Sequence, residues 1–485
     1  MNGASTVTPT QPSPPRWIAW IDTFALGCLL VGVGIALSPG RVRLEVAGTT
    51  LSLGSAWRPL CAGLLLIGVR HWRQRKPHLG ERLASSLGRP TDHAVVLSLR
   101  MLVVTRLPVL AAGCAATLLI GLAPDVRPIS RDPFRNLPLR WDATWYVEIA
   151  RVGYHDPRRP AGGQQPIVFF PVYPMMMRTL GAFTTPERTA SMSYEEYLEL
   201  RRVRLAWSGL VISLLAFAGA LVVVYRWAES RAGAEAAAAT VVLLSTYPFA
   251  VFYSAPYTES VFLLLTAGAC YAFEKGRLPV AAAAALLAGL TRPNGMMLSV
   301  PLAVLSLGEI HSREPGWIKR LIPRVLVAAM PVAGTLIYTG FIKTLTGDPF
   351  AWIRAQAAWG RRGDATILQY QWAFRTVQDE GILAYVRAVP AEAFQLVAVV
   401  FAFALVWPVW RRVGAAYALF ILANLVPPLI QGGLLSLGRF TATLFPLFLA
   451  LAVLVPAERR GNWVIVFSIA QGLIAAVFFS WRAIY

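Results

Sequence analysis

The chain has 485 residues, of which 56% are hydrophobic and 14% are charged, and its formal net charge is +20. This composition excludes an ordinary soluble globular protein, because so large an apolar excess must face lipid. The positive charge does not indicate nucleic-acid binding. No recognition motif accompanies it, and the basic residues cluster between apolar blocks, as in the cytoplasmic loops of membrane proteins.

The first part of the chain predicts a tail and a pair of helices. Residues 1–16 are rich in Thr, Pro and Ser and are predicted to form a disordered tail. We expect an uncleaved transmembrane helix at 18–37, a short hairpin at 42–53 and a second helix at 57–69. With the basic cytoplasmic linker that follows, residues 17–91 are interpreted as an accessory helix pair.

A long interval without a clean spanning helix follows the next apolar run. It covers residues 124–204 and belongs to a predicted catalytic module of residues 92–310. A loop of this length inside a compact protein is usually functional or disordered. Its many aromatic residues argue against disorder and favour short helices that lie in the membrane interface. We therefore predict a large first external loop that carries interfacial helices.

Two unusually short apolar pieces, 280–290 and 296–307, surround the polar segment Thr291-Arg292-Pro293-Asn294-Gly295. Neither piece spans a bilayer comfortably alone. The sequence therefore leaves two arrangements open, a hairpin with a polar tip or one long broken helix. The hairpin agrees better with the positive-inside rule and puts Glu259 and Arg292 on the external side.

The remaining residues, 311–485, predict further spanning helices and a second external loop at 347–388. Because the apolar runs are continuous and lack a two-residue alternation, the fold class is an all-α polytopic membrane protein with about 12 or 13 transmembrane helices. The clearest runs are Ile18–Leu37, Leu102–Leu122, Leu205–Tyr225, Val325–Leu345, Phe394–Trp410, Phe440–Leu454 and Trp463–Phe479.

The segment from Arg140 to Tyr154 places carboxylates among aromatic residues beside a membrane surface. A sugar transfer needs this combination, because the acceptor hydroxyl must lose its proton as it attacks the anomeric carbon. Asp142 is the candidate base, and Glu148 ranks below it because it points elsewhere on a helix. The sequence leaves open that Asp142 pairs with Arg140 or caps a short interfacial helix.

The leaving group of such a reaction is a lipid phosphate, whose growing negative charge must be met by fixed cations. Arg292 and Arg439 are candidates, since each lies next to an apolar helix, where burying a charge is expensive. Snorkelling or pairing with a structural carboxylate is the alternative for both. Glu259 can pair with one of these arginines or contact the acceptor, although a helix N-cap by Thr258 or Ser260 also explains its segment.

Several motifs are absent from the sequence. There is no phosphate-binding loop, no Asp-x-Asp pair for a divalent metal on a nucleotide sugar, and no His-Glu-x-x-His zinc motif. We therefore expect a reaction without metal or other cofactor, in which the sugar donor is a lipid monophosphate.

Six blocks of sequence together resemble the bacterial relatives of the phosphatidylinositol-glycan class V (PIG-V) mannosyltransferases, members of the GT-C superfamily of membrane glycosyltransferases. The blocks are Trp141-Asp142-Ala143 with Trp145-Tyr146, Phe169-Phe170-Pro171-Val172-Tyr173-Pro174, Tyr257-Thr258-Glu259-Ser260, Thr291-Arg292-Pro293-Asn294-Gly295, Gly347-Asp348-Pro349-Phe350-Ala351 with Gln356 and Trp359, and Arg439-Phe440 followed by Phe445-Pro446-Leu447.

The resemblance extends from about Leu102 to the C-terminus. It implies a GT-C-type fold, a polyprenyl- or dolichyl-phosphate-mannose donor, inversion at the anomeric carbon and an essential acid in the first external loop. That role falls on Asp142. We expect the donor phosphate at Arg292 and Arg439, and substrate contacts at Arg140, Trp141, Tyr146, Glu259, Asn294 and Gln356.

The leading hypothesis is an inverting glycosyltransferase that moves a mannosyl or other hexosyl residue from a polyprenyl-phosphate carrier to a glycan, glycolipid or protein. The expected location is the external face of a bacterial inner membrane. A lipid or sugar transporter without catalysis is the alternative, and a non-catalytic subunit is a third. A transporter typically shows a repeat that relates two halves of the chain. One pair of short helices and one dominant external loop favour the enzyme.

Overall fold

The structure, a computed structural model, describes residues 16–37, 42–46, 49–53, 57–73, 92–154, 163–184, 189, 191–312 and 316–484. The predicted tail, except Arg16, and the predicted basic linker beyond Arg73 lie outside the described residues. The chain divides into two compact units, Met1–Asp92 and His93–Tyr485.

The described residues of the first unit form two helices and one hairpin, as the sequence predicted. Helices α1 (Arg16–Leu37) and α2 (Trp57–Arg73) pack against each other. Between these helices in the sequence come strands β1 (Val42–Val46) and β2 (Thr49–Leu53), which pair with each other in antiparallel fashion.

Close contact between α1 and α2 depends on glycine. A Cβ atom on Gly32 would lie 2.5 Å from Leu60 Cγ, and one on Gly63 would lie 2.9 Å from the backbone oxygen of Ala25. Within this interface Arg70 donates a hydrogen bond of 3.1 Å to Asp22. Small residues thus let the two backbones approach, as in many membrane helix pairs.

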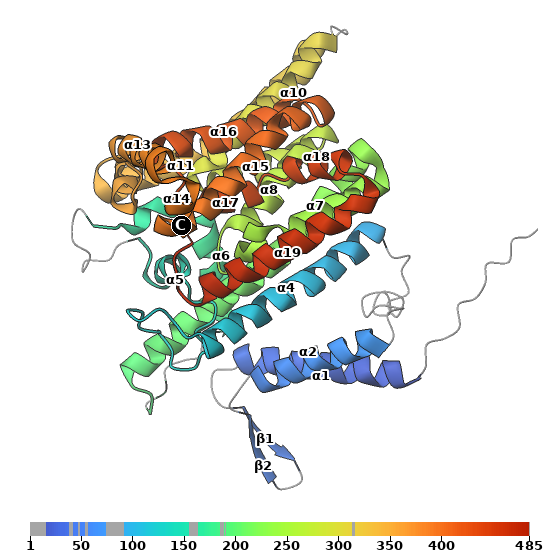
Figure 1. The fold of residues 1–485 in the computed structure, drawn as a ribbon, viewed down its shortest axis with the longest axis vertical. Helices are drawn as coiled ribbons and strands as arrows, with labels where there is room; N and C mark the ends of the chain where they lie inside the picture. Colours follow the sequence, from blue (N-terminus) through green and yellow to red (C-terminus); the bar gives the residue numbers. More distant parts are fainter. Residues whose placement is uncertain are drawn as a thin grey trace, which may run out of the picture. The chain divides into compact units, whose positions relative to one another are not determined.

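The second unit is built from helices (Figure 1). Its α-helices are α4 (His93–Leu119), α5 (Ala143–Val152), α6 (Val172–Thr184), α7 (Tyr194–Thr246), α8 (Glu259–Glu274), α9 (Leu278–Gly289), α10 (Ser299–Ser312), α11 (Trp317–Thr346), α12 (Ala351–Arg354), α13 (Gly363–Glu380), α14 (Ile382–Ala388), α15 (Pro390–Arg412), α16 (Ala415–Gly432), α17 (Leu437–Ala442), α18 (Pro446–Leu454) and α19 (Ala457–Phe479). Between them, the described part of the unit contains the 3₁₀ segments η1 (Pro166–Val168), η2 (Pro248–Ser254), η3 (Pro293–Leu298) and η4 (Ala355–Trp359).

Among the described helices, six are long and apolar enough to cross a membrane, namely α4, α7, α11, α15, α16 and α19. The chain is therefore a multi-pass, helical membrane protein, as predicted. Helices α8, α9, α10 and α18 have 16, 12, 14 and 9 residues. They are shorter than the roughly 20 residues that a full span takes. The total of about 12 or 13 spanning helices accordingly stays a prediction.

Helix α7 extends the predicted run Leu205–Tyr225 at both ends. It has 53 residues and starts with a capping box between Ser193 and Glu196. Its backbone kinks at Gly233, where φ is +82°. The helix ends at Thr246, because Pro248 disfavours helical geometry at Tyr247 before it.

The predicted single helix Phe440–Leu454 is wrong. Two short helices replace it, α17 and α18, with a break before Pro446. Proline lacks the backbone N–H that a continuous helix requires, but it fits the first turn of a new one. Arg439 consequently lies on a six-residue helix of its own.

The segment around Arg292 forms the tip of a hairpin, the first of the two arrangements left open. Phe273, just before α9, has its ring 5.0 Å from the Arg324 guanidinium carbon, whereas Gly289 at the end of α9 packs against Pro331. Helix α11 therefore runs parallel to α9. Helix α10 shortly precedes α11 in the chain and packs along it, so α10 returns antiparallel to both.

Several short helices of the second unit lie toward one end of its bundle, at the left of Figure 1, namely α5, α6, α13, α14 and α17, whereas the short helix α18 lies toward the right. The long helices α4, α7 and α19 pack against one another and extend away from this end. The broken segments that carry Asp142, Glu259, Arg292 and Arg439 meet among the short helices.

Candidate functional site

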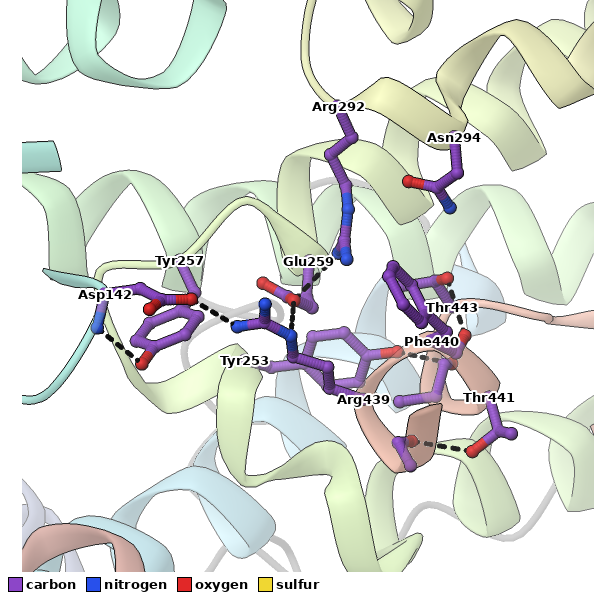
Figure 2. A network of polar contacts seen from close by, with 12 residues as sticks. Asp142, Tyr253, Tyr257, Glu259, Arg292, Asn294, Arg439, Phe440, Thr441 and Thr443 are labelled. Atoms are coloured by element: carbon purple, nitrogen blue, oxygen red, sulfur yellow. Dashed lines mark hydrogen bonds and ion pairs between the residues drawn. The ribbon is translucent and has the colours of Figure 1, made fainter. Parts of the chain in front are cut away.

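Four charged side chains from four separate segments form one continuous network (Figure 2). Arg439 Nη1 donates to Asp142 Oδ2 at 2.6 Å, and Arg439 Nε lies 3.7 Å from Glu259 Oε1. The same Glu259 oxygen accepts a hydrogen bond of 2.8 Å from Arg292 Nη1. The structure thus brings together the candidate base and both candidate cations, and it confirms that Glu259 pairs with these arginines.

A break in helical structure presents each member of the network. Asp142 precedes α5, Glu259 begins α8, Arg292 lies between α9 and η3, and Arg439 lies on α17. A side chain at such a terminus or break can leave the helix surface and reach a partner from another segment. Prolines after Arg292 and before the α8 segment, at Pro293 and Pro256, keep these breaks from becoming regular helix.

Burial increases along the network from Asp142 to Glu259. The side chains of Asp142 and Arg439 are 14% and 15% exposed, whereas Arg292 is 7% and Glu259 is 1% exposed. Two acids and two arginines give the network no net charge. Such mutual pairing is what makes burial of four charges tolerable in a low-dielectric interior.

The neighbouring carboxylates keep Arg439 ionised. Burial alone would lower the pKa of Arg439, but the carboxylates of Asp142 and Glu259 outweigh burial and raise it above the ordinary value. Arg439 therefore stays cationic and fixes the orientation of the Asp142 carboxylate.

Both structural alternatives for Asp142 fail. Asp142 is the N-cap residue of α5, but its side chain makes no capping hydrogen bond. Arg140 does not pair with it, because the Arg140 guanidinium is buried and donates to the backbone oxygens of Phe479, Asn136 and Leu139. The geometry favours a structural role for Arg140 over the substrate contact expected from the sequence.

Backbone geometry is unusual on both sides of the Asp142–Arg439 pair. Trp141 has φ of +49° and Ser436, three residues before Arg439, has φ of +61°. Residues other than glycine pay about 1–3 kcal/mol for this left-handed region, and such strain concentrates at functional sites. The Tyr257 hydroxyl accepts a hydrogen bond of 3.1 Å from the Asp142 backbone N–H and helps hold the loop in place.

Aromatic side chains surround the network. The Trp141 ring lies 5.0 Å from the ring of Trp481. Tyr146 is buried and packs edge-on against Phe169 and Tyr173, with ring centroids 5.1 and 5.2 Å apart. Burial, with help from Glu259 and Asp142, raises the pKa of Tyr146 well above its ordinary value, so its hydroxyl stays protonated at the network.

The remaining predicted contacts are Asn294, which lies in the same segment as Arg292, and Gln356. Asn294 donates a hydrogen bond of 2.8 Å to Asn424, a buried residue of α16 that the sequence analysis missed. A polar residue inside an apolar helix was the signal available for Asn424. Gln356 lies in η4, whose Trp359 packs against Trp145 and Phe169.

The other carboxylate of α5, Glu148, does not belong to the network. It accepts hydrogen bonds of 2.6 Å from both Arg151 and Arg202. Burial alone would raise the pKa of Glu148, but these two arginines outweigh burial and lower it. This placement agrees with the sequence analysis, which ranked Glu148 below Asp142 as the candidate base.

Comparison with known proteins bears on this site. Residues 112–313 match the family model described as mannosyltransferase (PIG-V). The chain is PIG-V-like over this segment. The PIG-V-like segment includes Asp142, Glu259 and Arg292, whereas Arg439 comes from the chain that follows it.

Two curated relatives of the PIG-V-like chain are named GPI mannosyltransferase 2, from two strains of Cryptococcus neoformans var. neoformans serotype D. One is 28% identical over 210 residues, which cover 43% of this chain and 45% of the relative. The other is 30% identical over 175 residues, which cover 36% of this chain and 38% of the relative. The matched residues thus span less than half the length of either relative.

Proposed function

We propose that this protein is an inverting glycosyltransferase that moves a mannosyl residue from a polyprenyl-phosphate carrier to an acceptor at the membrane. The observation that supports it best is the network of Asp142, Arg439, Glu259 and Arg292, which places a carboxylate that can act as a base in contact with fixed cations. The similarity to mannosyltransferases over residues 112–313 supports the same class of reaction.

Asp142 acts as the base in this proposal. The acceptor oxygen attacks the anomeric carbon from the face opposite the phosphate, and the bond from that carbon to the phosphate oxygen breaks. The bonding electron pair leaves with the phosphate, and the acceptor proton passes to the Asp142 carboxylate. Arg439 holds one oxygen of that carboxylate in place, which keeps the base oriented before the acceptor arrives.

Positive charge for the leaving phosphate comes from arginine rather than from a metal ion. Arg292 and Arg439 supply part of it, and they keep Glu259 and Asp142 close to the reacting groups. Fixed guanidinium groups in a site that excludes water stabilise a developing phosphate charge without reorganising. The proposed reaction therefore needs no metal or other cofactor.

The proposed location is the external face of a bacterial inner membrane. The positive-inside rule assigns the basic residues at the start of α11 and at the end of α15 to the cytoplasm, and the network lies at the other end of the hairpin that precedes α11. A membrane glycan, glycolipid or protein is the proposed acceptor.

The test is transfer by the purified chain. Incubation with polyprenyl-phosphate-mannose labelled in the sugar, together with a membrane lipid extract, should yield a labelled product and an equal amount of polyprenyl phosphate. A protein that moves the donor across sealed vesicles without releasing polyprenyl phosphate would be a transporter and would contradict the proposal.

A further inference from the structure

A fifth charged residue, Arg361, lies beside the network and was not among the residues expected from the sequence. It follows η4, and its backbone N–H donates a hydrogen bond of 3.2 Å to Gln356 O. Its side chain passes over Gly432 at the end of α16, where an added Cβ would lie 3.1 Å from Arg361 Cγ. The absence of a side chain at Gly432 leaves the room that Arg361 occupies.

Arg361 and Arg292 converge on one aromatic ring. The guanidinium carbon of Arg361 lies 5.6 Å from the centroid of Phe440, and that of Arg292 lies 4.7 Å from the same centroid. Phe440 directly follows Arg439 in the chain. Three guanidinium groups are thus collected around α17, each attracted to an aromatic face or a carboxylate.

Arg361 differs from the other two arginines in its partners. Arg439 and Arg292 are neutralised by Asp142 and Glu259, whereas Arg361 has no ion pair or side-chain hydrogen bond with any described residue. Burial, and then the charges of Arg439 and Arg292, lower the pKa of Arg361 to about 10. Its guanidinium therefore remains cationic at neutral pH, and the five charged groups together carry one surplus positive charge.

A phosphodiester carries one negative charge, which equals this surplus. We propose that the Arg361 guanidinium binds the phosphate of the lipid-linked sugar donor, an assignment that rests on the proposed function. Arginine suits this task because its planar fork can donate two parallel hydrogen bonds to phosphate oxygens. When the sugar leaves, the phosphate becomes a monoester with more negative charge, and Arg361 then stabilises the leaving group.

The surface next to Arg361 suits a phosphate that arrives on a lipid. Helix α13 starts two residues further on, and its apolar side chains Ile367 and Phe374 are 59% and 70% exposed. Exposed apolar side chains on a membrane protein face hydrocarbon or the interface rather than water. Arg361 is therefore positioned where a carrier's headgroup can reach it while the chain stays in lipid.

The neighbouring residue provides a matched control. Arg362 is also an arginine, but its side chain is 59% exposed and it pairs with the exposed carboxylate of Asp364 at 3.0 Å. The variants Arg361→Ala, Arg361→Lys and Arg362→Ala should be compared in a purified, detergent-solubilised protein. Size-exclusion profile and thermal unfolding of each variant show whether it is folded.

Two measurements separate this assignment from the proposed function. The first is binding of polyprenyl phosphate, which carries no sugar, by native mass spectrometry. The second is the KM for polyprenyl-phosphate-mannose at saturating acceptor. Loss of one charge-assisted hydrogen bond predicts about a tenfold to hundredfold weaker binding and higher donor KM for Arg361→Ala. Arg361→Lys should lie between that variant and the wild type, and Arg362→Ala should match the wild type.

Each outcome has one meaning. Binding that depends on Arg361, without sugar transfer by the wild type, supports the phosphate site and contradicts the proposed function. Sugar transfer with an unchanged donor KM in a folded Arg361→Ala protein overturns the phosphate site and leaves the function standing. Equal weakening by Arg361→Ala and Arg362→Ala would show only a general effect of surface charge and would also overturn the assignment.

Discussion

Asp142 directly precedes helix α5 and Glu148 lies within it, yet the structure gives the two carboxylates different partners. Glu148 is held by Arg151 of its own helix and by Arg202 of α7. Asp142 is held by Arg439, which is separated from it by most of the chain, and through Arg439 it is linked to Glu259 and Arg292. Glu148 thus links two neighbouring helices, whereas Asp142 belongs to a site assembled from distant segments of the second unit.

The largest expected effect is on the rate of sugar transfer, and it distinguishes Asp142 from Glu148. Asp142→Asn keeps the shape of the side chain but removes a base, so turnover should fall by about 10²- to 10⁴-fold. Glu148→Gln should change turnover by less than about threefold, because it only weakens an ion-paired cluster away from the network. Initial rates of sugar transfer at saturating donor measure both. Equal rates for Asp142→Asn and the wild type would remove Asp142 from the chemistry.

The second prediction concerns the free energy of unfolding. It compares the buried Glu259–Arg292 pair with the partly exposed ion pairs of Glu148. Glu259→Gln leaves Arg292 without its carboxylate in a site where Glu259 is 1% exposed. Breaking a buried pair in this way should cost about 3 kcal/mol of unfolding free energy. Glu148→Gln should cost at most about 1 kcal/mol, because its carboxylate is partly exposed. Denaturation of both variants in the same detergent gives the difference, and similar stabilities would show that the network is not effectively buried.

A third prediction concerns the hydroxyl that braces the Asp142 loop. Tyr257→Phe removes the acceptor of the Asp142 backbone N–H and keeps the aromatic packing. One lost hydrogen bond of this kind is worth about 1 kcal/mol, so turnover should fall roughly fivefold while donor KM changes little. Tyr154→Phe is the matched control, since the Tyr154 hydroxyl donates to Phe169 O rather than to the Asp142 loop. A larger fall for the control would contradict the bracing role.

The smallest effect is a pH dependence confined to Glu148. Its pKa is lower in the folded protein than the ordinary value of 4.5, so its ion pairs add stability above that pH and lose it as pH falls. The stability difference between wild type and Glu148→Gln, at most about 1 kcal/mol at neutral pH, should therefore shrink towards zero in acid. Thermal unfolding of both proteins across this range measures it, and a difference that grows in acid would contradict the sign.

Local signals explain which parts of the site could be predicted. Asp142, Arg292 and Arg439 stand out because each is a charge beside apolar or aromatic residues, where burial is costly. Their mutual contacts could not be read from spacing, because Asp142 and Arg439 come from opposite ends of the second unit. Arg361 was missed for a related reason. In the sequence it is one half of an Arg-Arg pair that resembles a solvated loop, and only the fold turns Arg361 towards Phe440 while Arg362 stays exposed.

In the fold, too, some parts could be predicted from the sequence and others could not. Apolar runs predicted most of the long helices, and the sequence also predicted the hairpin at 42–53 in the first unit. The breaks were harder to predict, since the run from Phe440 to Leu454 is apolar apart from Thr441 and Thr443, and Pro446 is the main signal that two helices share it. This break matters for the site, because it frees α17 to carry Arg439 to Asp142.

The most direct test of the network as the donor site is photo-crosslinking. A polyprenyl-phosphate sugar with a photoreactive group next to the phosphate should label segments that contain Asp142, Arg361 or Arg439, and excess polyprenyl phosphate should suppress the labelling. Labelling confined to the Glu148–Arg202 side of α5, or to the first unit, would contradict the assignment.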